Sequence, residues 1–82
     1  MTESDLRLAS FKNARLDMSV LVGCDFFGAN FFAASLGACD LTRASLRCAN
    51  LFLANLDGAS LGSCDFTGAN LGKTQMEHAT DA

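Results

Sequence analysis

The residues of this chain that could do chemistry are four cysteines, one histidine and nine acidic side chains. No cysteine is spaced from another, or from His78, as the ligands of known zinc motifs are. His78 is the only histidine, and no serine or cysteine has a supporting base in its sequence context. A phosphate-binding loop and a dinucleotide fingerprint are also missing. We therefore expect a protein that is not an enzyme and that uses no cofactor, no metal and no small-molecule substrate.

The elements that position these residues form a repeat of five residues. A large apolar residue recurs at every fifth position: Leu6, Phe11, Leu16, Leu21, Phe26, Phe31, Leu36, Leu41, Leu46, Leu51, Leu56, Leu61, Phe66, Leu71 and Met76. A small residue stands two positions before each, and the residue between them is mostly Asp, Asn or Ser. On an α-helix, a step of five residues turns the apolar position by about 140°, so these residues would spread around the helix. On a strand, successive ones would lie on opposite faces.

The chain must therefore change direction once in every unit. All seven glycines fall in the last two positions of the unit, where a turn needs a permissive backbone. The sequence thus predicts short extended pieces joined by regular turns, with the small and the large apolar residue pointing toward a common axis.

Units such as Ala49-Asn50-Leu51 and Cys64-Asp65-Phe66 resemble the A(D/N)LXX motif of pentapeptide-repeat proteins. The resemblance covers about fifteen units and implies an all-β fold, a right-handed quadrilateral β-helix with four units per coil. Fifteen units make just under four coils. We expect a single domain over residues 1–82, with regular repeats from about 4 to 78 and a tail over 79–82.

The positions of the cysteines argue against disulfides. Cys24, Cys39 and Cys64 occupy the small inward slot, where cysteine acts as a small hydrophobic residue. Cys24 and Cys64 are two coils apart, about 9.6 Å at the spacing of neighbouring strands, which is too far for a disulfide. Cys48 lies in a turn slot and is expected to be exposed.

Residues 20 apart stack if four units make a coil, and this projection gives two acidic columns. Asp5, Asp25 and Asp65 belong to the first, and Asp17, Asp57 and Glu77 belong to the second. Like charges one coil apart reduce stability, but surface carboxylates also keep a small β protein soluble. Asn30, Asn50 and Asn70 form a further column, whose side chains we expect to hydrogen-bond along the column.

An apolar group is predicted on the outer wall. Phe32 and Phe52 would stack in the slot after the central apolar residue, with Leu53 in the adjoining turn and Phe27 in the same slot of the neighbouring side. Clustered outward aromatic residues usually mark an interface. The uncovered ends of a β-helix are a second candidate, because their unpaired backbone groups can add another chain.

The formal net charge is only −3, and the acidic excess lies in the second half of the chain. No basic patch with interleaved aromatic residues is present, so direct binding to nucleic acid is not expected. The acidic start lacks the features of a signal peptide, and no stretch is long and apolar enough to cross a membrane. We expect a soluble cytoplasmic protein.

Two functions remain open. The first is a non-catalytic interaction or scaffold protein, a homodimer or a member of a complex, with Phe27, Phe32, Phe52 and Leu53 as its contact surface. The second is implied by the resemblance, because some pentapeptide-repeat proteins are acidic dimers that mimic duplex DNA and bind DNA gyrase, giving fluoroquinolone resistance. Its residues here would be those of the acidic columns. The short length and weak charge argue against it, since duplex DNA carries one charge per about 1.7 Å.

Overall fold

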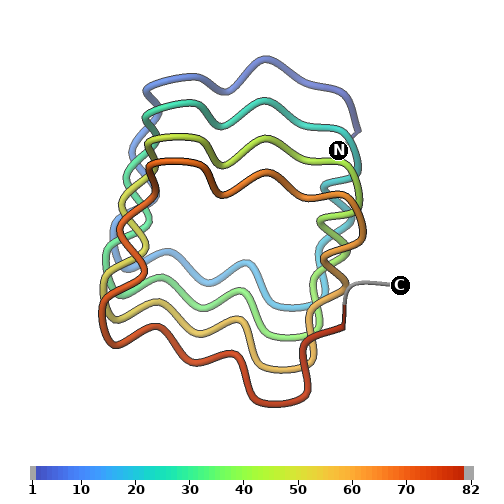
Figure 1. Ribbon diagram of the computed structural model, residues 1–82, viewed down its shortest axis with the longest axis vertical. Helices are drawn as coiled ribbons and strands as arrows, with labels where there is room; N and C mark the ends of the chain where they lie inside the picture. The colour runs from blue at the N-terminus through green and yellow to red at the C-terminus, as the bar shows by residue number, and fades with distance from the viewer. Residues whose placement is uncertain (1, 81–82) are drawn as a thin grey trace.

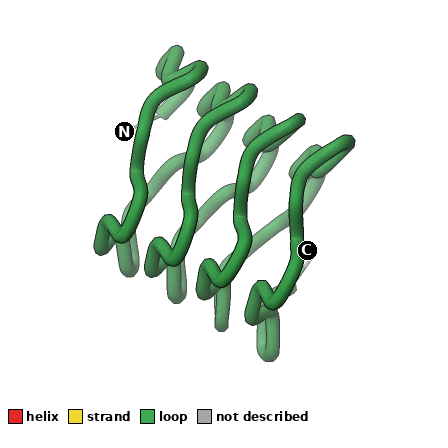
Figure 2. The backbone as a smooth tube through the Cα atoms, turned by 90° about the vertical axis from the view of Figure 1, so that its left-hand side faces the viewer, coloured by secondary structure: helices red, strands yellow, loops and turns green. Residues whose placement is uncertain are grey.

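A computed structural model describes residues 2–80 as a stack of square coils. Every fifth residue from 5 to 80 makes a parallel β-bridge to the residue 20 positions away. Within residues 2–80 each bridge stands alone, so no strand is longer than one residue and no helix forms. Figure 1 shows the coils stacked in chain order, and Figure 2 shows the same stack from the side. The β-helix with four units per coil is as predicted.

The bridging residues form four columns, one on each side of the square. Side 1 carries Asp5, Asp25, Ser45 and Asp65; side 2 carries Ser10, Asn30, Asn50 and Asn70; side 3 carries Arg15, Ser35, Asn55 and Gln75; side 4 carries Val20, Asp40, Ser60 and Thr80. Each column has four members, so the described residues hold sixteen units and make about four coils, one unit more than the fifteen counted from the sequence. The three extents of the molecule are 27, 25 and 22 Å, so this short β-helix is about as wide as it is long.

A turn at the end of every unit makes the corner of the square. The N–H of the small residue donates to the carbonyl three residues earlier, as in Ala34 to Phe31 at 2.9 Å. The residue before the small one has a positive φ in every unit, while the residue before that does not, which defines a type II turn. Four glycines, Gly23, Gly28, Gly58 and Gly68, occupy this left-handed position. The other twelve units place a residue with a side chain there, which strains the backbone.

Backbone hydrogen bonds join each inner coil to both of its neighbours. The N–H of Asn30 donates to Ala9 in the preceding coil at 2.9 Å, and that of Phe31 donates to Asn50 in the following coil at 2.7 Å. The N–H at the left-handed position also donates forward, as in Ala33 to Phe52 at 2.9 Å. One N–H in each unit, that of the residue after the central apolar one, reaches neither neighbour by this pattern.

The Asp or Asn of the motif satisfies this remaining N–H. Asn30 Oδ1 accepts from the N–H of Phe32 at 2.9 Å, within the same unit. The same contact is made by Asp5, Asp25, Asp40, Asn50, Asn55, Asp65 and Asn70. We expected the Asn side chains to bond along their column, but their Oδ1 atoms are used locally. A short side chain that caps a turn two residues on is a common role of Asp and Asn.

The core is the inside of the square, and it is filled by the predicted slots. Its buried members are Leu21, Cys24, Phe26, Ala29, Phe31, Ala34, Leu36, Cys39, Leu41, Ala44, Leu46, Ala49, Leu51, Ala54, Leu56 and Ala59. Phe11 and Phe31 stack with ring centroids 5.0 Å apart, and Phe26 meets Phe31 edge-on at the same distance. Burial is complete in the middle of the stack and partial in the first and last coils.

The repeat runs two residues further than the expected limit of about 78. Thr80 bridges to Ser60, and the N–H of Ala79 closes a turn onto Met76 at 3.1 Å. Part of the expected tail over 79–82 is therefore regular. Residues 81–82 lie outside the described residues.

Candidate interaction surfaces

The predicted apolar surface divides into two parts on different sides of the β-helix. On side 2, the Phe32 and Phe52 rings lie 6.0 Å apart at an angle of 60°. Lys12 Nζ lies 5.7 Å from the centre of the Phe32 ring, a cation–π contact. Both rings are half-buried, and Leu53 in the adjoining turn is 47% exposed. These residues therefore form the stack that the sequence predicted, but Lys12 covers one end of it.

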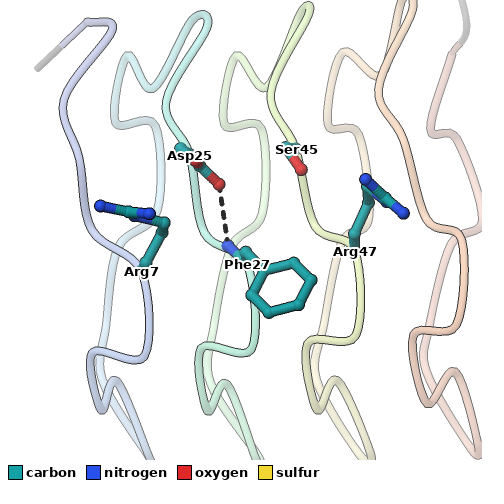
Figure 3. A pocket seen from close by; sticks show the side chains of 5 residues that line it. All are labelled: Arg7, Asp25, Phe27, Ser45 and Arg47. Atoms are coloured by element: carbon teal, nitrogen blue, oxygen red, sulfur yellow. Dashed lines mark hydrogen bonds between the residues drawn. The ribbon is translucent and has the colours of Figure 1, made fainter.

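Phe27 lies apart from this stack, on side 1 between two arginines. Arg7, Phe27 and Arg47 stand in the same slot of successive coils, and Figure 3 shows the ring projecting between the two splayed guanidinium groups. With Asp25 and Ser45 they line a shallow hollow of about 320 Å³. Phe27 is 40% exposed and is more accessible than the two stacked rings of side 2.

The carboxylates of the first acidic column are paired with neighbours. Asp5 forms a two-pronged ion pair with Arg7, with both N–O distances at 2.8 Å. Asp65 accepts a bond of 2.6 Å from the Thr67 hydroxyl and lies 3.8 Å from Arg47 Nε. Asp25 Oδ1 accepts from the N–H of Phe27 at 3.1 Å, the dashed line in Figure 3. The carboxylates of this column therefore stabilise their own turns and hold the side chains of Arg7 and Arg47 in place.

In the second acidic column, on side 3, two of the three carboxylates also contact neighbouring side chains. Asp17 Oδ1 accepts from the Ser35 hydroxyl and, at 3.2 Å, from the N–H of Gly37 in the next coil. Asp57 Oδ1 lies 2.9 Å from His78 Nδ1. His78 stands in a regular turn slot of the last coil. Glu77 lines a small hollow with Asp57 and Gln75.

Hydrogen bonds lower the pKa of three aspartates, of which Asp5 and Asp65 are exposed and Asp40 is half-buried. The Arg7 guanidinium holds the pKa of Asp5 below its ordinary value. The hydroxyls of Thr42 and Thr67 do the same for the pKa of Asp40 and of Asp65, respectively. All three carboxylates are therefore ionised at neutral pH, and none has the raised pKa that a general acid needs.

The cysteines lie where the repeat predicted. Cys24 and Cys39 are buried, Cys64 is half-buried and Cys48 is exposed, and no disulfide joins Cys39, Cys48 or Cys64. Cys39 Sγ donates to the carbonyl of Leu16 at 2.8 Å. Burial raises the pKa of the Cys64 thiol to about 12, so this residue stays protonated and unreactive. Within residues 2–80 no cluster of His, Cys, Asp and Glu has the arrangement of a metal site.

Three polar residues were not identified from the sequence as parts of these surfaces: Arg7, Arg47 and His78. The signal for Arg7 was available, because it follows Asp5 by two residues, the distance that the turn contact requires. Arg47 and His78 could have been placed by the spacing of 20 residues between coils. Arg47 shares the slot of Phe27, and His78 stacks on Gly58, next to Asp57.

The model for pentapeptide repeats matches residues 24–61 and 54–80, with eight copies of the repeat. The chain belongs to the pentapeptide-repeat family. Proteins of this family are generally structural or interaction proteins. No curated protein matches the sequence.

Solved pentapeptide-repeat structures share the fold. Rfr23 from the cyanobacterium Cyanothece 51142 is 18% identical with a TM-score of 0.54, covering 98% of this chain and 86% of its own. QnrB1, described as a plasmid-mediated fluoroquinolone resistance protein, is 21% identical with a TM-score of 0.56, covering 95% of this chain and 46% of its own. These neighbours are right-handed quadrilateral β-helices, and so is this chain.

A protein from the Arabidopsis thaliana thylakoid lumen is 27% identical with a TM-score of 0.47. The match covers 94% of this chain and 61% of the plant protein, so the chain spans under two thirds of that relative. Among the described residues, no helix has the length and hydrophobicity needed to traverse a bilayer.

Proposed function

We propose that this protein is a non-catalytic interaction module that associates with itself, with Phe27, Phe32, Phe52 and Leu53 as its contact residues. The observation that carries the proposal is the exposure of apolar side chains on an outer wall that otherwise bears polar groups. Phe27 and Leu53 are 40% and 47% exposed, and Leu8 and Met18 exceed 70%. On a chain of this size, clustered outward apolar residues are typical of surfaces that other proteins cover.

The shape of the molecule supports a binding role over a catalytic one. The polar side chains stand on the outside of a square coil, and the hollows between them are shallow. The carboxylates of side 1 are held by turns and arginines, and hydrogen bonds lower the pKa of Asp5 and of Asp65. A reaction would need an enclosed site that excludes water and holds an acid or base of suitable pKa.

The proposal is tested by measuring solution mass with light scattering over a range of concentrations. We expect the natural chain to associate as its concentration rises. A variant combining Phe27→Ser, Phe32→Ser and Phe52→Ser is expected to remain a monomer. These side chains lie outside the core, so its circular dichroism and unfolding temperature should change little. A natural chain that stays monomeric at every concentration would remove self-association from the proposal.

The alternative, an acidic mimic of DNA that acts on gyrase, has less support. Asp5 and Asp65 lie beside arginines, and Asp57 lies beside a histidine, so the columns present fewer free charges than their sequence suggests. The nearly equal extents of 27, 25 and 22 Å also give no long axis that could imitate a duplex. A gyrase supercoiling assay tests this alternative, and inhibition or protection by the protein that is lost in Asp17→Asn with Asp57→Asn would favour it.

A further inference from the structure

We infer that side 1, centred on Phe27, docks on side 3, centred on Gly37, of a second copy of this chain. The inference rests on the self-association proposed above and assigns the two surfaces that meet. Sides 1 and 3 are opposite sides of the square, so one molecule carries both surfaces and can use each with a different neighbour.

Side 1 presents an aromatic ring between two cations. Arg7, Phe27 and Arg47 stand in the same slot of three successive coils, about 4.8 Å apart from one to the next. The arginine side chains are 59% and 54% exposed, and the Phe27 ring projects between them. A partner for this surface needs two anions that flank a space for the ring and that stand in slots two coils apart, about 9.6 Å from backbone to backbone.

Side 3 presents that arrangement in the equivalent slot. Asp17, Gly37 and Asp57 follow one another in successive coils, so the two carboxylates have the same spacing as the two arginines. Gly37 has no side chain, and a hollow of about 340 Å³ lies over it. The exposed Met18 and the polar Ser35 also line this hollow. An apolar ring entering here would meet a methionine, and the flanking arginines would meet carboxylates.

The polar columns of the two sides determine how the second copy is oriented. Opposite sides of a coil run in opposite directions, so a copy turned end for end brings polar column against polar column. With Phe27 over Gly37, Asp25 then lies opposite Ser35, and Ser45 lies opposite Arg15. In this orientation no carboxylate of the two polar columns faces another carboxylate. Complementary charges of this kind select the partner and its register.

The size of one side and its existing contacts are compatible with such docking. One side amounts to about a sixth of the 4452 Å² surface, close to the ~800 Å² that each partner contributes to a standard interface. The ion pairs of Arg7 and Arg47 with side 1 aspartates are exposed, and exposed pairs contribute little, so their rearrangement costs little. The bonds of Asp17 and the contact of Asp57 with His78 all use Oδ1, and Oδ2 of each aspartate is the atom that an incoming arginine would contact.

A contact between two different surfaces does not close on itself, so association continues into open chains unless one surface is blocked. Two single variants can block one surface each. Phe27→Ser removes the ring of side 1. Gly37→Gln fills the hollow of side 3, and a Cβ there would meet its nearest atom, the Asp57 carbonyl oxygen, at an ordinary distance of 3.5 Å.

The experiment measures the mass of each variant, alone and in an equimolar mixture, by sedimentation velocity. We expect each variant alone to associate at least about tenfold more weakly than the natural chain. The mixture should form one-to-one dimers and nothing larger, because the intact side 3 of one variant accepts the intact side 1 of the other. Val22→Gln changes the equivalent slot on side 4 and should associate like the natural chain, while Phe52→Ser is measured beside it to report on the contact residues of side 2.

The outcomes separate this inference from the proposed function. If the natural chain associates but Phe27→Ser and Gly37→Gln associate equally well, or their mixture stays monomeric, the docking of side 1 on side 3 is wrong and self-association stands. Loss of association in Phe52→Ser alone would place the contact on side 2. A natural chain that never associates overturns both.

Discussion

Leu46 and Leu71 occupy the same slot of the repeat, yet one is fully buried and the other is 40% exposed. Coils lie on both sides of Leu46, because the adjacent Ser45 bridges to Asp25 and to Asp65. The adjacent residue of Leu71 is Asn70, which bridges to Asn50 in the preceding coil. The comparison separates two sources of order in this fold. Stacking depends on the neighbouring coils, whereas turn geometry belongs to each unit.

Truncating Leu46 and Leu71 should give the largest difference in stability between the inner coils and the last coil. We expect Leu46→Ala to lower the free energy of unfolding by about 2–5 kcal/mol, because it leaves a cavity between three coils. Leu71→Ala should lower it by only about 1 kcal/mol, since part of this side chain is already in water. Urea unfolding followed by circular dichroism measures both. Equal losses would mean that the last coil is covered in solution.

Removing the Asn side chain that caps a turn should also destabilise an inner coil more than the last coil. Asn50 Oδ1 accepts from Phe52 at 3.1 Å, and Asn70 Oδ1 accepts from Gly72 at 3.0 Å. We expect Asn50→Ala to destabilise the chain by about 1–3 kcal/mol, because it leaves the Phe52 N–H of a part-buried turn without its acceptor. Asn70→Ala should cost less, since water can reach its turn. Asn50→Asp, which keeps the acceptor, serves as the control in the same unfolding measurement.

Changes at the left-handed position should have the same effect in any coil, because the strain there is local. Gly58, with φ +76°, and Ala38, with φ +55°, stack in one column. We expect Gly58→Ala to destabilise the chain by about 1 kcal/mol and Ala38→Gly to stabilise it by up to about the same amount. In the last coil, the Lys73→Gly variant should be more stable than the Lys73→Ala variant by a similar margin. Thermal unfolding of the four variants decides whether the effect is independent of position.

The smallest expected effect is a dependence on acid. The pKa of Asp40 and that of Asp65 are lowered in the folded state from 3.8, so their contribution to stability is present above that value. It is lost as the pH falls through the lowered folded-state pKa. We expect Asp40→Asn with Asp65→Asn to show a flatter decline of the urea midpoint below about pH 4 than the natural chain. An identical decline would assign the acid sensitivity to other carboxylates.

The core and the course of the chain could be predicted from the sequence because both depend on one period. The step of five residues excludes a continuous helix or strand and places Cys24, Cys39 and Leu46 inside, where the structure has them. Side-chain hydrogen bonds were harder to predict, since they depend on which backbone N–H each coil leaves unpaired. That is why the amides of Asn30 and Asn50 were assigned to a column and not to their own turns.

The outer surface was only partly predictable for a related reason. Phe32 and Phe52 were placed together correctly by the spacing of 20 residues, and Phe27 was correctly assigned to the neighbouring side, but the two arginines that flank its ring were not identified. Asp5 and Asp65 were counted as free charges because their partners, Arg7 and Arg47, were not projected onto the same side. The residues that meet on this wall depend on the number of units per coil as well as on the repeat itself.

The bridge between each residue and the one 20 positions later has a consequence for how such a chain can change its length. The packing of the core is preserved when a single unit is gained or lost, because every unit contributes the same pair of a small and a large apolar residue. The outer wall is not, since five added residues turn everything downstream by one side of the square. Such an insertion between Phe27 and Arg47 would move Arg47 to the next side and separate it from Arg7. Only insertions or deletions of a multiple of 20 residues preserve the surface, so the interior can accept a change of five residues but the exterior accepts only a change of 20.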